Sequence, residues 1–287
     1  MWLKYWSWTF NDGFIHVELM DNLEFFSERN DPMKCIILAL ITLFTASQAS
    51  ARVFSFDSET VAPFINIRGG LSSMSSAPFE WQSASSYSGD EVDLIYGGEF
   101  GIYFRSSLGL GVSLGVLVDT FDPVEGGAAS NAGGVSLFTV NTEGLSYGPS
   151  LLFDYQFGTT QSYLWKFVFG GGYQFAEIEN TYSMTATGQA LVGGQSTFTE
   201  TYKAEIPFAM IGIGTEFVLS GTSTMSFLLG YHYALANEWS YGQGGQNFAG
   251  SHTQDGDVLF ENGSKKTIDW SYPFLQVGFN FYVDTVR

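Results

Sequence analysis

From Val61 onward, apolar residues alternate with small or polar residues along most of the chain, which is a period of two. The clearest run joins Leu108, Leu110, Val112, Leu114, Val116 and Val118, with Gly109, Gly111, Ser113, Gly115, Leu117 and Asp119 between them. Residues 145–157 and 275–283 show the same alternation. A period of two predicts β-strands whose two faces meet different surroundings, and no helical period explains these runs.

The alternation predicts eight strands, near residues 61–70, 94–104, 108–119, 144–157, 163–178, 202–219, 225–239 and 267–283. Three connections are short, namely 105–107, 158–162 and 220–224, and four are long and polar, namely 71–93, 120–143, 179–201 and 240–266. Short and long connections alternate strictly, as in transmembrane barrels with short periplasmic turns and long extracellular loops. An even strand count would place both ends of the barrel on the periplasmic side.

A soluble β-sandwich would also show alternating strands, but its outer face would carry many charges. Here the second face is mostly Gly, Ser, Ala, Asn and Gln, which suits a narrow lumen, and strands of ten or more residues exceed the usual globular length. Aromatic residues also collect near the strand ends, as in the girdles at membrane interfaces. We therefore predict an all-β fold, an eight-stranded antiparallel up-and-down transmembrane β-barrel.

Composition supports a membrane barrel over a soluble protein. Only 14% of residues are charged, against about 25% in soluble domains, while 45% are hydrophobic and 17% aromatic. No apolar run reaches the roughly 20 residues that a spanning helix needs. The formal net charge of −18 argues against nucleic acid as a partner, because phosphate binding needs a basic surface.

Residues 33–51 have the pattern of a secretory signal peptide. Met33-Lys34 is followed by the apolar stretch 35–44 and then by Ala49-Ser50-Ala51, an A-x-A cleavage pattern. We expect cleavage after Ala51 and a barrel over 52–287, and we interpret residues 1–32 as the result of a start assigned too early, with a disordered or amphipathic extension as the alternative. Cys35, the single cysteine, lies at the start of this apolar stretch and not after it, where a lipoprotein signal would place its cysteine, so it supports neither lipidation nor a disulfide.

The last predicted strand, residues 276–283, looks like the signal that the barrel-assembly machinery reads, although residues 284–287 follow its last aromatic. Over residues 52–287 the chain resembles the small outer-membrane barrels of the OmpA, OmpX and OmpW type, in architecture rather than in a diagnostic motif. The resemblance implies a place in the outer membrane of a Gram-negative bacterium. It also implies outer-membrane lipids and lipopolysaccharide as partners, and the assembly machinery during insertion.

Several charged residues have lumen-facing parity, and they are Arg68, Glu99, Asp154, Lys166 and Glu216. They could line a polar pathway for ions or small solutes, or they could pair and plug the lumen. Eight strands leave an interior just wide enough for side chains to fill, and buried charges need partners. We favour the plug.

No residue pattern identifies a catalytic, cofactor or metal site. His232 has lumen parity, but Ser226 and Glu238 are each six residues away, too far for an immediate dyad along one strand. Acidic residues recur in or beside the long loops, and they are Asp90, Glu91, Asp93, Asp122, Glu125, Glu177, Glu179, Asp255, Asp257 and Glu261. They could bind divalent cations, alone or bridging to lipopolysaccharide phosphates, but we favour simple solvation of the loops.

Three functions remain open from the sequence. The first is a non-enzymatic surface barrel that stabilises the envelope and presents loops to a surface ligand that the sequence does not identify. The second is a narrow porin, or a channel for small apolar molecules as proposed for the OmpW type. The third is a lipid-modifying enzyme of the membrane that uses Ser226 or His232.

Overall fold

A computed structural model describes residues 9–11, 14–16, 55–56, 60–72, 86–89, 92, 94–129, 134–190, 192–236, 238–247, 250–258, 265 and 268–283. The chain divides into two compact units, Met1–Ala46 and Ser47–Arg287. In the first unit, β1 (Thr9–Asn11) and β2 (Phe14–His16) form a small antiparallel pair. The predicted signal peptide, residues 33–51, lies outside the described residues.

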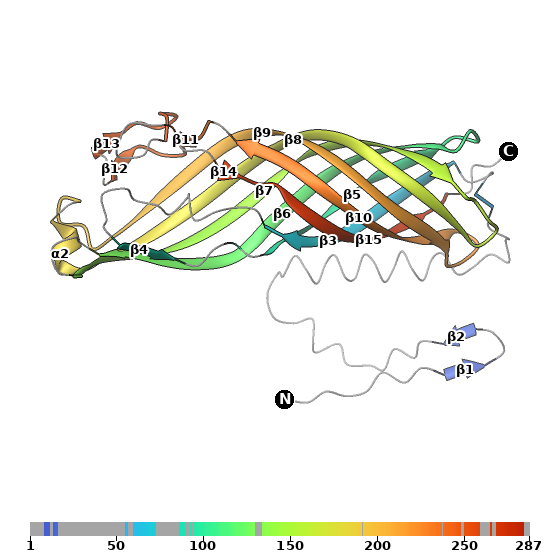
Figure 1. Ribbon diagram of the computed structural model, residues 1–287, viewed down its shortest axis with the longest axis horizontal. Helices are drawn as coiled ribbons and strands as arrows, with labels where there is room; N and C mark the ends of the chain where they lie inside the picture. The colour runs from blue at the N-terminus through green and yellow to red at the C-terminus, as the bar shows by residue number, and fades with distance from the viewer. Residues whose placement is uncertain are drawn as a thin grey trace. The chain divides into compact units, whose positions relative to one another are not determined.

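Eight strands of the second unit form a closed antiparallel ring, in the order β3-β5-β6-β7-β8-β9-β10-β15 and back to β3. Their bounds are β3 Val61–Leu71, β5 Leu94–Arg105, β6 Leu110–Ala129, β7 Ser136–Phe157, β8 Tyr163–Met184, β9 Thr197–Val218, β10 Ser223–Ala236 and β15 Tyr272–Phe281. Each of these eight strands pairs with the one of the eight that follows it in the chain, and the ring closes where β15 pairs with β3 (Figure 1). This confirms the predicted eight-stranded up-and-down barrel.

A belt of apolar side chains covers the outer surface of the barrel. On β7 and β8 the outward residues are Leu145, Tyr147, Leu151, Phe153, Tyr155, Phe157, Tyr163, Trp165, Phe167, Phe169, Tyr173 and Phe175, each at least 38% exposed. So large a contiguous apolar surface is unfavourable in water, whereas it matches the hydrocarbon core of a membrane. Because the closed ring also satisfies the backbone hydrogen bonds of its strands, the barrel spans a membrane.

Strand takes up most of the predicted long loop 120–143 and both ends of the predicted long loop 179–201, which corrects the sequence prediction. β6 runs on to Ala129 and β8 to Met184, so that β6, β7, β8 and β9 reach 20 to 22 residues each (Figure 1). A membrane needs only about 9–11 residues of a tilted strand. The extra length forms a sheet beyond the belt, which we call the distal sheet.

The polarity of the two faces is reversed in the distal sheet. The alternation with apolar residues outward therefore stops before the strands themselves end. On β8, Phe175 is outward and apolar, whereas the next outward residues, Glu177 and Glu179, are acidic. The inward residues there are mostly apolar, and Ile178 and Tyr182 are both buried, with the polar Asn180 between them. The period of two therefore continues with the apolar side turned inward.

At the tip of the distal sheet, a small hydrophobic core joins β7, β8 and β9 to Val192, which follows the short helix α2 (Ala186–Gln189). Its members are Leu137, Phe138, Val140, Tyr182, Met184 and Val192, with Phe198 packed against them. The rings of Tyr182 and Phe198 stack with centroids 4.6 Å apart. The tip thus has packing of its own, independent of the lumen.

Shorter elements border the distal sheet. β4 (Ser86–Gly89) pairs with β6, and β11 (Ser240–Tyr241) pairs with β9. β12 (Gly245–Asn247) pairs with β13 (Gly250–His252), and β14 (Ile268–Asp269) pairs with the end of β10. The predicted eighth strand is therefore interrupted near Trp270 and Ser271, where the Ser271 hydroxyl accepts a hydrogen bond from the Ala234 amide.

The connections at the other end of the barrel are tight. Residues 106–109 join β5 to β6, and Gly109 has a φ of +74°, a conformation that other residues rarely adopt. Arg105 was expected in this turn, but it is the last residue of β5 and its side chain is buried. Because β5 is one residue longer than predicted, Arg105 belongs to the strand and its charged side chain lies inside the barrel.

The reversal of polarity leads to a prediction for one face of one strand. We expect Leu151→Arg in the belt to lower the free energy of unfolding by about 2–4 kcal/mol, the cost of a cation facing lipid. Thr139→Arg, on the same face of β7 but in the distal sheet, is expected to change it by less than about 0.5 kcal/mol. Urea unfolding in lipid vesicles measures both, and equal losses would contradict a membrane boundary between these positions.

Candidate functional site

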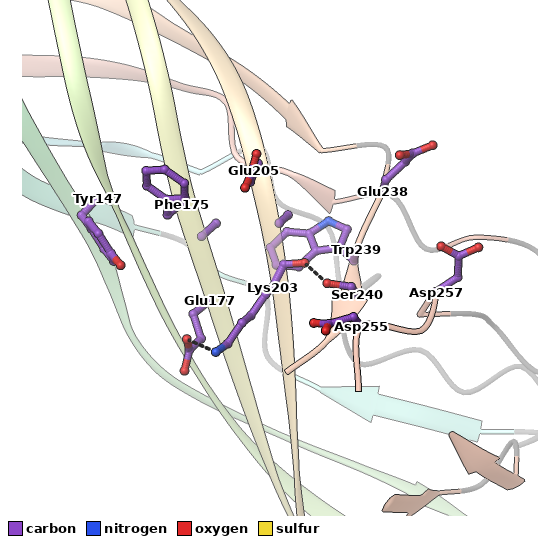
Figure 2. Close-up of a pocket in the computed structure, with 12 residues that line it drawn as sticks. Tyr147, Phe175, Glu177, Lys203, Glu205, Glu238, Trp239, Ser240, Asp255 and Asp257 are labelled. Carbon is purple, nitrogen blue, oxygen red and sulfur yellow. Dashed lines mark hydrogen bonds and ion pairs between the residues drawn. The ribbon is translucent and has the colours of Figure 1, made fainter. Parts of the chain in front are cut away.

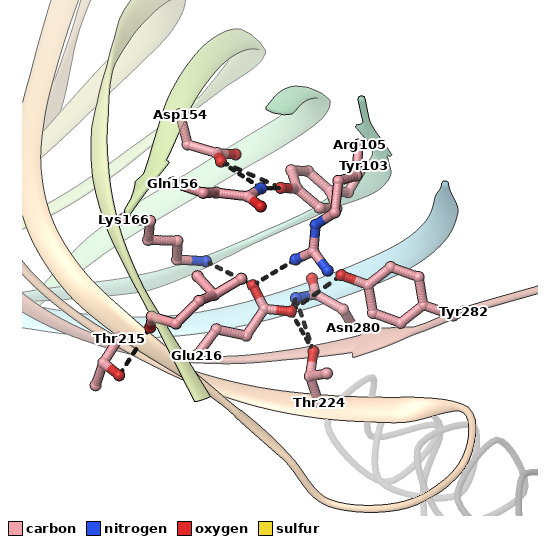
Figure 3. A network of polar contacts seen from close by, with 11 residues as sticks. Tyr103, Arg105, Asp154, Gln156, Lys166, Thr215, Glu216, Thr224, Asn280 and Tyr282 are labelled. Carbon is pink, nitrogen blue, oxygen red and sulfur yellow. Dashed lines mark hydrogen bonds and ion pairs between the residues drawn. The ribbon is translucent and has the colours of Figure 1, made fainter. Parts of the chain in front are cut away.

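The first of three layers of buried side chains in the lumen lies at the end with the short turns, and we call it the turn-end layer (Figure 3). Its centre is Glu216 on β9, which is fully buried. One carboxylate oxygen, Oε2, lies 3.0 Å from Nη2 of Arg105 and 3.6 Å from Nζ of Lys166. The other oxygen, Oε1, accepts hydrogen bonds from three neighbours, namely Thr224, Asn280 and Tyr282.

The guanidinium of Arg105 contacts the carboxylate of Glu216 and also three aromatic rings. Its guanidinium carbon lies 4.9 Å from the ring centroid of Phe56, 5.4 Å from that of Tyr103 and 5.2 Å from that of Tyr282. A buried cation is tolerated where an anion and aromatic faces replace water. Glu216 supplies the anion and the three rings supply the aromatic faces, so the charge of buried Arg105 is compensated within the turn-end layer.

Asp154 completes this layer without an ion pair among the described residues. Its Oδ1 accepts hydrogen bonds from the Tyr103 hydroxyl at 3.2 Å and from Nε2 of Gln156 at 2.9 Å. Facing it on β6 is Gly111, where a Cβ would lie 2.2 Å from Oδ2 of Asp154. The small residue leaves the room that the buried polar side chains occupy.

The middle layer is a buried ion pair between Arg68 on β3 and Asp119 on β6. Nε and Nη2 of Arg68 donate to the two carboxylate oxygens of Asp119 at 3.1 and 2.7 Å, which is a two-point contact. Nη1 of Arg68 lies 3.3 Å from the sulfur of Met210, and Gln174 donates to Asp119 at 3.1 Å. Both charged side chains are fully buried, so this pair crosses the lumen away from solvent.

Glu99 on β5 has no ion-pair partner among the described residues. Its carboxylate accepts hydrogen bonds from Nδ2 of Asn66 at 3.2 Å and from the Ser150 hydroxyl. The residue is 1% exposed. Neutral donors on β3 and β7 therefore occupy its oxygens.

The third layer is aromatic and lies toward the distal sheet. The ring of His232 lies between Phe208 and Tyr272, with centroid distances of 4.9 and 5.0 Å. The guanidinium of Arg68 sits 5.5 Å from the Tyr272 ring, which joins this layer to the middle one. Trp270 packs 5.7 Å from Phe121, and both are buried. Large buried rings thus follow the Arg68–Asp119 pair along the lumen.

This arrangement does not assemble the catalytic group considered from the sequence. His232 is packed among aromatic rings, while Ser226 lies six positions away on β10, paired in register with Glu216. Glu238 is exposed and its carboxylate lies 3.4 Å from Nζ of Lys265. Within the described residues, no group of three or more His, Cys, Asp or Glu side chains could hold a metal ion.

The structure places all five residues of the expected lumen network inside the barrel and adds two that sequence reasoning missed. Lys166 and Glu216 come together, whereas Arg68 pairs with Asp119 and not with one of the five. The two additional residues are therefore Asp119, the partner of Arg68, and Arg105, a partner of Glu216. Asp119 stood on the lumen face of the alternating pattern, so parity could have found it, but the end of β5 hid Arg105.

No helix in the part of the chain that the structure describes is long and apolar enough to cross a membrane. No protein-family model matches the chain, and no curated protein is similar to it in sequence.

Solved structures with a similar arrangement of strands include three outer-membrane proteins. A major outer membrane protein from Thermus thermophilus is 15% identical, with 77% of this chain and 99% of that chain covered and a TM-score of 0.42. OprG from Pseudomonas aeruginosa is 14% identical, with 80% and 100% covered and a TM-score of 0.36. The Outer Membrane Protein W of E. coli is 16% identical, with 78% and 99% covered and a TM-score of 0.29.

The architecture of this chain rests on its own strand pairing and surface. A closed antiparallel ring of eight strands, an apolar outer belt and short turns at one end together define a barrel of the bacterial outer-membrane type. The protein is a small outer-membrane β-barrel, in agreement with the location predicted from the sequence.

Proposed function

We propose that this protein is a closed, non-enzymatic barrel of the outer membrane, which anchors the distal sheet at the cell surface as a platform for contact. The observation that carries the proposal is the succession of three layers of buried side chains in the lumen. An ion cluster around Glu216, the Arg68–Asp119 pair and the aromatic layer follow one another along the lumen.

The chemistry of the layers supports a permanent closure rather than a pathway. A conducting pore needs polar groups that an ion can reach and leave. In this lumen each cation lies against a carboxylate, and Arg68, Asp119 and Glu216 have side chains with 1% exposure or less. Opening the barrel would require separating buried ion pairs, at several kcal/mol for each ion that loses its partner.

The distal sheet supports the surface role. It continues four barrel strands beyond the belt, and its tip has a hydrophobic core of its own. A rigid sheet presents side chains with less loss of conformational entropy on binding than a long flexible loop does. The outward side chains there are mostly threonine and acidic residues, such as Thr181, Thr199 and Glu179.

Solute uptake by proteoliposomes tests the proposal. We expect vesicles that contain the folded barrel to swell in small sugars and amino acids no faster than empty vesicles, while a general porin at the same density gives rapid swelling. Uptake that rises in proportion to the amount of protein would instead support a narrow porin.

A prediction for the tip separates the platform from the plug. We expect Tyr182→Ala to make residues 185–196 sensitive to protease, because this change removes the ring that stacks on Phe198. The barrel below should stay resistant and closed. Limited proteolysis with mass analysis of the fragments reads this out, and cleavage within β10 or β15 would contradict an independent tip.

A further inference from the structure

A groove of about 490 Å³ opens on the outer face of the sheet where the apolar belt ends (Figure 2). We call it the rim groove. It runs from Tyr147 on β7 and Phe175 on β8, across Lys203 and Glu205 on β9, to residues 238–240, 255 and 257. Along β9, Pro207 is the last residue on the belt side of the boundary and Glu205 is the first polar one.

The two walls of the rim groove differ in chemistry. The rings of Tyr147 and Phe175, with centroids 5.8 Å apart, are exposed at the edge of the apolar belt. Beyond them, five carboxylates line the groove, namely Glu177, Glu205, Glu238, Asp255 and Asp257, against the single ammonium of Lys203. Such an amphiphilic surface matches a molecule with a hydrocarbon part and a cationic part.

Ion pairs within the protein neutralise only part of this charge. Nζ of Lys203 lies 3.5 Å from Glu177, and Nζ of Lys265 lies 3.4 Å from both Glu238 and Asp257. The hydrogen bond to Asp257, with the charge of Glu238, raises the pKa of Lys265, so this ammonium stays charged. Among the described residues, Glu205 and Asp255 have no ion-pair partner, which leaves a net negative charge in the groove.

We propose that the rim groove binds the positively charged amino group of a membrane amphiphile of the outer leaflet, whose hydrocarbon chain lies along Tyr147 and Phe175. The membrane itself supplies the amphiphile at high local concentration, so the groove needs to supply only selectivity for the headgroup. Its carboxylates are exposed, so the selectivity is modest and weakens as salt screens the charges. The proposal is independent of whether the lumen conducts.

Electron spin resonance with chain-labelled lipids tests this selectivity directly. Two probes with the same chain and opposite charge, spin-labelled stearylamine and spin-labelled stearic acid, are compared in phosphatidylcholine vesicles that contain the barrel. The pH is set so that the amine is cationic and the acid anionic. At low salt we expect the amine to associate about fivefold more strongly than the acid, as judged from the motionally restricted fraction.

Two variants with the same change in charge locate the effect. The groove variant carries Glu205→Gln, Glu238→Gln, Asp255→Asn and Asp257→Asn, and should lose the preference for the amine. The control variant carries Asp122→Asn, Glu125→Gln, Glu143→Gln and Glu179→Gln, all exposed residues outside the groove lining, and should keep it. Heat-dependent gel mobility verifies that both are folded.

Each other outcome overturns the proposal. If the wild-type protein does not prefer the amine, the groove is not selective. If both variants lose the preference equally, the attraction comes from the general negative field of the distal sheet. If only the control variant loses it, the binding surface lies on β6 to β8 away from the groove.

Discussion

Glu216→Ala is expected to lower the free energy of unfolding by about 3–5 kcal/mol, the cost of leaving buried charges without their partner. Arg105 and Lys166 would both lose the carboxylate that lies 3.0 and 3.6 Å from them. Three neutral hydrogen-bond donors would lose their acceptor as well. Urea unfolding in lipid vesicles, followed by tryptophan fluorescence, measures the loss.

The matched control for this prediction is Glu143→Ala, which removes an exposed carboxylate on the outward face of β7. Its effect should stay within about 0.5 kcal/mol. A loss for Glu216→Ala no larger than that of the control would mean that the turn-end layer is hydrated and its charges are screened, which contradicts a closed lumen.

Arg68→Ala is expected to cost a similar amount, about 3–5 kcal/mol, because it leaves Asp119 buried with only neutral donors. Removing both charges with Arg68→Met and Asp119→Leu should recover at least half of that loss. Apolar side chains of similar volume often replace a buried ion pair at little cost. The same urea experiment on the two single variants and the double variant forms a thermodynamic cycle.

An exposed ion pair on the same protein provides the comparison. Lys203→Ala removes the partner of Glu177, where both side chains are about half exposed, and should cost no more than about 1 kcal/mol. If the double variant at Arg68 and Asp119 were no more stable than Arg68→Ala alone, the loss would come from packing against Tyr272 and Phe274 rather than from the stranded charge.

The sequence predicted the part of the fold that lipid constrains. Lipid demands an apolar side chain at every second position, so strands 61–70 and 94–104 were placed within one residue of β3 and β5. The alternation in the sequence could not place the ends of β6 to β9, because the distal sheet turns its apolar residues inward and its polar residues to solvent. Residues such as Thr139 and Glu179 look like loop residues when only the outward face is considered.

The interior was predicted in composition but not in pairing. Alternation identifies which residues face the lumen, and Arg68 and Glu216 were found in this way. Which of them meet depends on the tilt of the strands and the stagger of their register, which bring Asp119 of β6 to Arg68 of β3 across 51 residues of sequence. A single sequence does not specify that geometry, so the partners Asp119 and Arg105 came from the structure.

Electrical recording from single barrels in a planar lipid bilayer tests the central claim, the closed lumen, most directly, because small ions are the most sensitive probe of an opening. We expect folded, inserted protein to give no steady unitary current in concentrated potassium chloride, while a general porin in the same bilayer conducts. Discrete openings of constant size, whose number rises with the amount of inserted wild-type protein, would contradict the plug and support a channel.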